Sequence, residues 1–170
     1  MKNVIFQLIA LFLLLVLLQV WLFNNIHLFG FATPLLCIYF IIKLPVSMNR
    51  NVVMLLSALL GFIIDVFGNA LGLGMTALLI AGFLRYYLLK LFAPRDVFED
   101  YLPSFSAFGK YLFMRYAGIL TLIYICLIYV IESFSLLNLE LFFLRIAGSF
   151  TLTILLIFAF ESINIDAFKK

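Results

Sequence analysis

One apolar stretch near the middle of the chain decides the fold class. It is NVVMLLSALLGFIIDVF, from Asn51 to Phe67, and its single charged residue is Asp65. The run is longer than the about 4–8 residues of a strand and shows no alternation of polar and apolar positions, so it predicts a helix. Similar stretches precede and follow it along the rest of the chain.

The composition indicates an integral membrane protein. Of the 170 residues, 67% are hydrophobic and only 11% are charged, whereas a soluble domain usually carries about 25% charged residues. Disorder is excluded as well, because it requires low hydrophobicity and high net charge. A spanning helix needs roughly 20 residues, so residues 1–170 form a single polytopic domain with no room for a sizeable extramembrane domain.

Six apolar segments predict an all-α bundle of about six transmembrane helices. They cover about residues 3–23, 31–45, 51–67, 75–92, 111–131 and 138–163. The second is short and starts near Pro34, so it can either span the membrane or be re-entrant. The first is too long for the apolar part of a signal peptide and lacks a small-residue cleavage site, so it is read as an uncleaved span.

The placement of Lys and Arg predicts the orientation, because cytoplasmic loops carry an excess of both. With six spans, the outer loops 24–30, 68–74 and 132–137 contain neither residue. The opposite side collects nine: Lys2, Lys43, Arg50, Lys90, Arg95, Lys110, Arg115, Lys169 and Lys170. Both termini are therefore expected in the cytoplasm.

The sequence offers little for catalysis or cofactor binding. It has one histidine, His27, and lacks the HExxH, GxxxxGK[ST], CxxC and GxSxG patterns, so we expect no enzyme, metal or cofactor. Cys37 and Cys126 lie in apolar runs, so no disulfide is expected. The net charge is +3 with scattered basic residues, which argues against nucleic-acid binding.

Charges inside the spans are the informative feature, since each is unfavourable there unless it is paired or hydrated. Asp65 lies about 21 Å along the third span and Arg145 about 10 Å into the last, at a rise of about 1.5 Å per residue. We expect these two to pair, with Glu132 and Glu140 as shallower competitors. The pair would either fix helix packing or form a polar site facing outward.

A second polar group is predicted at the inner side. Arg85 in the fourth span and Glu161 in the sixth are candidates for a pair, although basic residues near inner helix ends need no function. The GxxxG pattern at Gly68–Gly72 lies at a helix end and is read as a turn, whereas Ala77 and Ala81 favour close helix packing. The long loop 93–109 mixes charges and aromatics, typical of an interfacial segment, a docking site or a plain connector.

Two local patterns resemble the MreD family, the rod shape-determining membrane proteins. Gly61-Phe-Ile-Ile-Asp65, followed by GNALG and Thr76-Ala77-Leu78, is similar to the family's glycine–acid–LG–AL stretch. The stretch LQVWLFNNIHLFGFATP, residues 18–34, and Pro94-Arg95-Asp96 look like the Bacteroidetes-type branch. The resemblance covers essentially the whole chain and rests on the order of these motifs within this length.

The resemblance implies a non-enzymatic subunit of the cell-elongation complex (the elongasome), which supports side-wall peptidoglycan synthesis and rod shape. The family works with MreC, and is linked to MreB, RodA and a penicillin-binding transpeptidase; a homodimer is also conceivable within the lipid bilayer. In fold the family resembles the S-components of energy-coupling-factor transporters, six-helix bundles with an outward pocket. The alternative function is therefore the substrate-binding subunit of a vitamin-type transporter.

Overall fold

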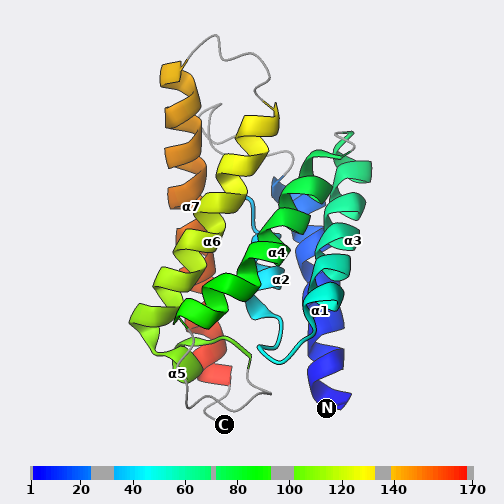
Figure 1. Cartoon of the computed structure of the whole chain (residues 1–170), viewed down its shortest axis with the longest axis vertical. Helices are drawn as coiled ribbons and strands as arrows, with labels where there is room; N and C mark the ends of the chain where they lie inside the picture. Colours follow the sequence, from blue (N-terminus) through cyan, green and yellow to red (C-terminus); the bar gives the residue numbers. More distant parts are fainter. Residues whose placement is uncertain (1, 24–32, 70–71, 93–101, 133–138, 168–170) are drawn as a thin grey trace.

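Long apolar helices run the length of the computed structural model, which describes residues 2–23, 33–69, 72–92, 102–132 and 139–167 (Figure 1). Within these residues, helices are the only regular secondary structure. Four are long and apolar enough to cross a membrane: α3 (Arg50–Gly68), α4 (Leu73–Phe92), α6 (Lys110–Glu132) and α7 (Leu139–Ala167), the last through its part Phe142–Ser162. The prediction of an all-α membrane protein is confirmed to this extent.

The first predicted span is helical but not uniform. The α-helix α1 (Lys2–Leu18) continues directly into one turn of π-helix, η1 (Gln19–Phe23). The apolar part that can be assigned, Phe6–Trp21, is shorter than the four long helices. Single π turns of this kind often occur at functional sites, and here the turn contains the buried Gln19.

The second predicted segment is not a spanning helix, which corrects the expectation of about six such helices. It contains only α2 (Ile38–Lys43), six residues long, or about 9 Å at 1.5 Å per residue, against a hydrocarbon core of about 30 Å. Two prolines explain the short length. Pro34 precedes the helix, and Pro45 forces Leu44 into an extended conformation with ψ 146°.

The helices form a row in the order α3, α4, α6, α7, with α1 beside α3 and α2 near the centre (Figure 1). The short helix α2 contacts α1, α4 and α6, and its residues Ile38–Ile42 are all buried. α1 begins and α7 ends at the same end of the molecule, the lower end in Figure 1. A short helix at that end, α5 (Phe105–Phe108), was not predicted and buries Phe105 and Phe108.

Glycines set the distance between α3 and α4. A Cβ on Gly61 would lie 2.5 Å from the Cα of Met75, and one on Gly82 would lie 2.5 Å from the Oγ of Ser57. The predicted turn at Gly68–Gly72 is confirmed, because α3 ends at Gly68 and Gly72 has a positive φ of 97°. The predicted small-residue packing also holds, since Ala77 and Ala81 are fully buried.

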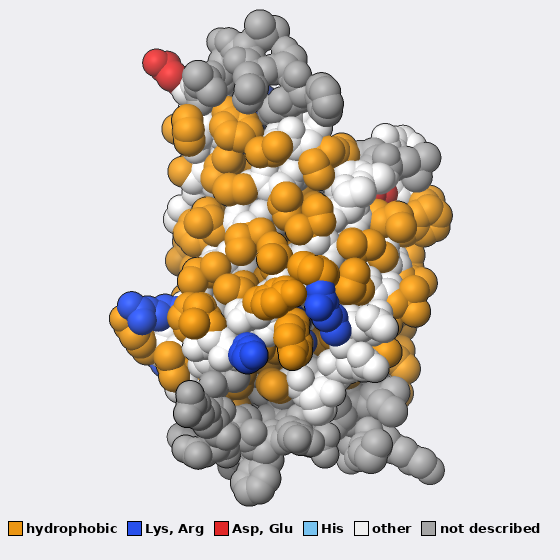
Figure 2. All heavy atoms as spheres, viewed as in Figure 1, with side chains coloured by type: hydrophobic (Ala, Val, Ile, Leu, Met, Phe, Trp, Pro, Cys, Tyr) orange, Lys and Arg blue, Asp and Glu red, His pale blue; other side chains and the backbone are white. Residues whose placement is uncertain are grey.

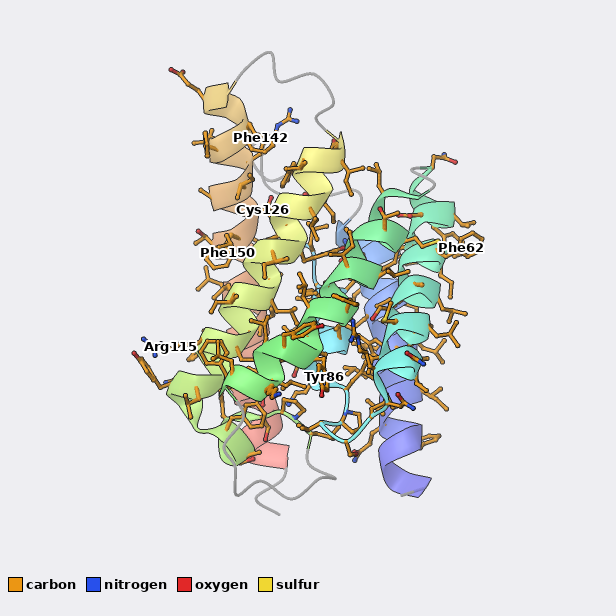
Figure 3. All side chains as sticks on the ribbon, viewed as in Figure 1. Phe62, Tyr86, Arg115, Cys126, Phe142 and Phe150 are labelled. Carbon is orange, nitrogen blue, oxygen red and sulfur yellow. The ribbon has the colours of Figure 1, made fainter. Side chains whose placement is uncertain are left out.

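The face shown in Figure 2 is apolar over most of its height, as a lipid-facing surface would be. Phe62 on α3 projects from one edge of the row and Arg115 on α6 from the other (Figure 3). Tyr86, Tyr87 and Tyr111 are about half exposed or more, and an arginine lies beside each ring: Arg50 beside Tyr86 and Tyr87, and Arg115 beside Tyr111. This distribution is the one expected of a membrane protein.

Candidate functional site

The candidate site is the stretch Thr33–Pro45, called here the buried segment, which runs through the interior as extended chain and the short helix α2. Nine of its 13 residues are buried and the other four are partly buried. Backbone N–H and C=O groups outside a regular helix need other partners wherever lipid excludes water. The buried segment finds these partners on side chains of η1, α4 and α7.

Gln19 of η1 binds the start of the segment on both sides of Leu35. Its Nε2 donates to the carbonyl oxygen of Pro34 at 3.2 Å, and its Oε1 accepts from the Leu36 N–H at 2.9 Å. The side-chain amide therefore substitutes for the two backbone partners that a continuous helix would have supplied. Gln19 is 1% exposed, so this pairing satisfies a polar group that would be unfavourable in lipid.

Hydroxyl groups of α7 bind the next backbone groups, and the hydroxyl of Tyr129 on α6 binds side-chain oxygens beside them. The Thr33 N–H donates to Ser149 Oγ at 3.1 Å, and the Leu35 N–H donates to Thr153 Oγ1 at 3.2 Å. The hydroxyl of Tyr129 lies 2.7 Å from Ser149 Oγ and 3.1 Å from Thr33 Oγ1. These contacts join residues about a hundred positions apart and fix the segment laterally.

Glu161 of α7 forms the centre of the polar contacts at the other end of α2. Its carboxylate accepts hydrogen bonds from Tyr39 Oη at 2.9 Å and from the Phe105 N–H at 3.2 Å. Lys43 Nζ lies 2.9 Å from Oε1 and 2.8 Å from Oε2. This is the single ion pair among the residues that the structure describes, and Glu161 is 1% exposed.

The predicted pair between Arg85 and Glu161 is wrong. Arg85 of α4 donates from Nη2 to the carbonyl oxygens of Leu44 and Pro45, the latter at 3.2 Å. Arg85 therefore binds the backbone just after α2 ends. The cation that pairs with Glu161 is Lys43. Arg85 binds the backbone of Leu44 and Pro45, whereas Glu161 binds side chains of α2.

The predicted pair between Asp65 and Arg145 is also absent. Asp65 accepts three backbone hydrogen bonds, from the N–H groups of Gly72, Gly74 and Met75 at 3.0, 2.8 and 2.9 Å. These donors lie at the N-terminus of α4, where N–H groups lack partners and the helix dipole favours a negative charge. Arg145 lies on α7, at the opposite end of the helix row from α3 (Figure 1).

The other charged residues considered from the sequence lie apart from these centres. Glu132 and Glu140 are exposed, and Arg115 is exposed on α6. His27 and residues 93–101 of the long loop lie outside the described residues, while residues 105–108 of that loop form α5. Within the described part, no three His, Cys, Asp or Glu side chains come together as a metal site would require.

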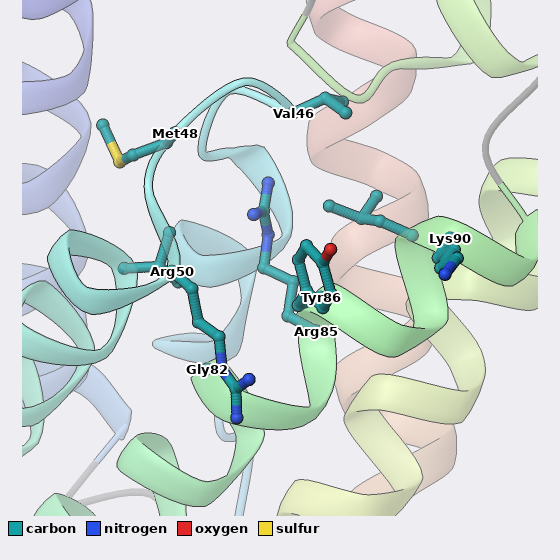
Figure 4. A pocket seen from close by; sticks show the side chains of 9 residues that line it. Val46, Met48, Arg50, Gly82, Arg85, Tyr86 and Lys90 are labelled. Atoms are coloured by element: carbon teal, nitrogen blue, oxygen red, sulfur yellow. The ribbon is translucent and has the colours of Figure 1, made fainter. Parts of the chain in front are cut away.

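A pocket of about 310 Å³ opens beside the C-terminal end of the buried segment (Figure 4). Its walls come from the first residues of α3, the last turns of α4 and the residues that follow Pro45. Arg50, Arg85 and Lys90 contribute three positive charges, and among the described residues no acidic side chain lines it. The remaining walls are mostly apolar, with Val53 and Leu89 among them.

The sequence did not identify several of these residues as part of the site. Gln19, Lys43, Ser149 and Thr153 all bind the buried segment or its partners. One signal could have found part of the site, because Ser149, Thr153, Ile157 and Glu161 recur every four residues and therefore share one face of a helix. All four are buried against the interior.

The polar side chains of the site bind other parts of the same chain. Each carboxylate inside the fold accepts hydrogen bonds from the chain itself, so the polar groups hold the buried segment and the α3–α4 turn in place. A comparison of the chain with protein families, with curated proteins and with solved structures gives no match.

Proposed function

We propose that the chain is a non-enzymatic, multi-pass subunit of the bacterial cell-elongation complex in the inner membrane. It binds MreC and supports side-wall peptidoglycan synthesis and rod shape. MreB, RodA and a penicillin-binding transpeptidase are further proposed partners, and a second copy of the chain is another. The proposal begins from the motif order around Gly61–Asp65 and Gly68–Gly72, which resembles the MreD family.

The observation that carries the proposal is the internal bonding of the two buried carboxylates. Asp65 accepts three backbone hydrogen bonds, and Glu161 binds Lys43, Tyr39 and the backbone of Phe105. A general acid or base, or a ligand-binding carboxylate, must be able to reach a substrate. Carboxylates used in this way suit a rigid subunit that positions partners and performs no chemistry itself.

The proposed topology has six passes, with the buried segment as the second pass and both termini in the cytoplasm. Two features support it. α1 begins and α7 ends at one end of the molecule, and Arg50, Lys90 and Lys110 lie at or near helix termini, on the side where the positive-inside rule places the cytoplasm. In this orientation the α3–α4 turn with Asp65 faces the periplasm, where MreC would be met.

The alternative is the substrate-binding subunit of a vitamin-type energy-coupling-factor transporter. It requires an outward-facing pocket, whereas the pocket beside Arg50, Arg85 and Lys90 belongs to the basic, cytoplasmic side of the proposed topology. The broken second pass is the feature in its favour, because discontinuous helices often form transporter sites. Here the polar groups of that pass bind neighbouring helices.

Depletion of the protein in its native host tests the proposal. Cells should round up, and labelled peptidoglycan precursors should lose their side-wall pattern, because the elongation complex would lack a subunit. Repeating the depletion in medium rich in vitamins controls for an indirect metabolic defect. Rounding that persists there supports the proposal, whereas rounding reversed by a vitamin favours the transporter, and unchanged rods contradict the proposal.

A further inference from the structure

The pocket beside Arg85 has a charge that nothing in the described structure balances. Arg85 is 2% exposed, and it donates hydrogen bonds to the neutral carbonyl oxygens of Leu44 and Pro45. Its Nε has no hydrogen-bond partner among the residues that the structure describes. A buried guanidinium without an anion is unfavourable in a medium of low dielectric, so the site as it stands is electrostatically incomplete.

Two further cations face the same cavity. Arg50 is held over the ring of Phe83, 3.8 Å from its centroid, which orders the guanidinium beside the pocket. Lys90 is exposed on the last turns of α4. Figure 4 shows Arg50, Arg85 and Lys90 around the cavity, on α3 and α4, so three positively charged side chains line a pocket of about 310 Å³.

The backbone adds to this positive potential. Arg50 is the first residue of α3, and the N-cap Asn49 forms no side-chain capping bond. The positive end of the dipole of this 19-residue helix therefore lies beside the pocket that Arg50 lines and favours an anion there. Arginine forks and helix N-termini are both typical ligands of phosphate oxygens.

The depth of the pocket matches that of lipid headgroups. It lies where α3 begins and α4 ends, so the apolar lengths of both helices extend away from it in one direction. Tyr86 and Leu89 form part of its wall, and Tyr86 is 51% exposed, as tyrosines at a membrane surface often are. Basic pockets between transmembrane helices at this level bind anionic lipid headgroups.

We propose that this pocket binds the phosphate group of an anionic ligand, supplied by the headgroup of an anionic phospholipid. Arg85 and Arg50 bind the phosphate oxygens, Lys90 contributes charge at the edge, and the acyl chains lie along the apolar surfaces of α3 and α4. The same chemistry would accept a soluble phosphate ester, which the experiment separates from a lipid.

The test uses the full chain, purified in a neutral detergent and delipidated, with binding followed by native mass spectrometry. The probes are dioleoyl phosphatidylglycerol, dioleoyl phosphatidylcholine and soluble glycerol phosphate. We expect saturable binding of phosphatidylglycerol, with phosphatidylcholine binding at least about tenfold more weakly, since each nearby Lys or Arg strengthens binding to anionic lipid. Saturable binding of glycerol phosphate with equal affinity would keep the phosphate site and assign it to a soluble ligand.

Paired variants locate the binding. Arg50→Gln with Lys90→Gln should weaken phosphatidylglycerol binding about tenfold or more. The matched control is Arg115→Gln with Lys110→Gln, which removes the same charge and also a cation stacked on a ring, Arg115 on Tyr111 at 4.5 Å. Lys90→Gln alone changes an exposed residue and keeps the test valid if the double variant misfolds. Equal losses in both pairs, or no saturable binding, would overturn the proposal.

Discussion

Asp65 shows how a single carboxylate inside a membrane can be satisfied without a charged partner. Its two oxygens accept from three backbone N–H groups at the start of α4. A Cβ on Gly74 would lie 2.5 Å from Oδ1, so the glycine is needed for this approach. The sequence located the charge but not its partner, because backbone donors carry no signature in residue type.

Asp65→Ala should destabilise the protein strongly. It leaves buried N–H groups without acceptors, and hydrogen bonds to a charged group contribute about 1.5–3 kcal/mol each, so a loss of about 3 kcal/mol or more is expected. Unfolding by SDS in mixed micelles measures it. Glu140→Ala, at an exposed carboxylate, is the control and should change stability by less than about 1 kcal/mol.

The same measurement tests the corrected partner assignment. Arg145→Gln should add to the effect of Asp65→Ala within about 0.5 kcal/mol, as distant and independent sites do. A larger coupling energy would show that Asp65 and Arg145 interact and would contradict the assignment to the α4 N-terminus.

Lys43 and Glu161 should behave as one unit. Lys43→Met leaves the Glu161 carboxylate buried without a cation, which typically destabilises a protein by about 3–5 kcal/mol. Adding Glu161→Gln should restore part of that stability, because the uncompensated charge is removed. Thermal unfolding of the two single variants and the double variant gives the coupling energy. If the changes in unfolding free energy of the two single variants simply add in the double variant, the ion pair does not contribute to the stability of the fold.

At the scale of helices, α3 and α4 pack closely because glycine lacks a side chain. Gly61→Ala would place a methyl group 2.5 Å from the Cα of Met75, and overpacking of this kind destabilises by about 1–3 kcal/mol. Gly118 on α6 is the matched control, since a Cβ there meets nothing within 4 Å. Gly118→Ala should be neutral or slightly stabilising. Equal unfolding temperatures for both variants would contradict the close packing.

The long helices were predictable from sequence because spanning is a local property. α3, α4 and α6 begin and end within about two residues of the apolar runs that predicted them. The buried segment was not predicted as it stands, because its partners are far away in the sequence. Ser149 and Thr33 bind each other although they lie 116 positions apart in the sequence. The hydropathy of the sequence does not indicate such a contact.

The two hydrogen bonds from Gln19 to the buried segment predict how accessible the Cys37 thiol is. In a Cys126→Ser background, Cys37 is the remaining cysteine and is 1% exposed, so it should react slowly with maleimide. Gln19→Leu removes the bonds to Pro34 and Leu36 and should raise the rate at least about tenfold through local opening. Gln7→Leu, at an exposed glutamine of α1, should leave the rate unchanged. If the rate of maleimide reaction is unchanged in Gln19→Leu, the Gln19 hydrogen bonds do not hold the buried segment in place.

At the scale of the whole molecule, the polar interior holds the buried segment in place and the apolar exterior is available for contact with lipid and partner proteins. Gln19 of η1, Arg85 of α4, and Ser149 and Glu161 of α7 all bind the buried segment. The outer surface then remains free for lipid and for partner proteins. The sequence predicted the membrane class, but partner surfaces leave no local pattern in a chain so uniformly apolar.

The central claim, that the chain is a scaffold of the elongation complex, is tested most directly by gentle affinity purification from native membranes. Mass spectrometry would identify both the proteins and the small molecules that remain bound. The account predicts MreC in nearly stoichiometric amount, with no enriched vitamin-like metabolite. A retained metabolite together with the subunits of an energy-coupling module, and no MreC, would contradict it.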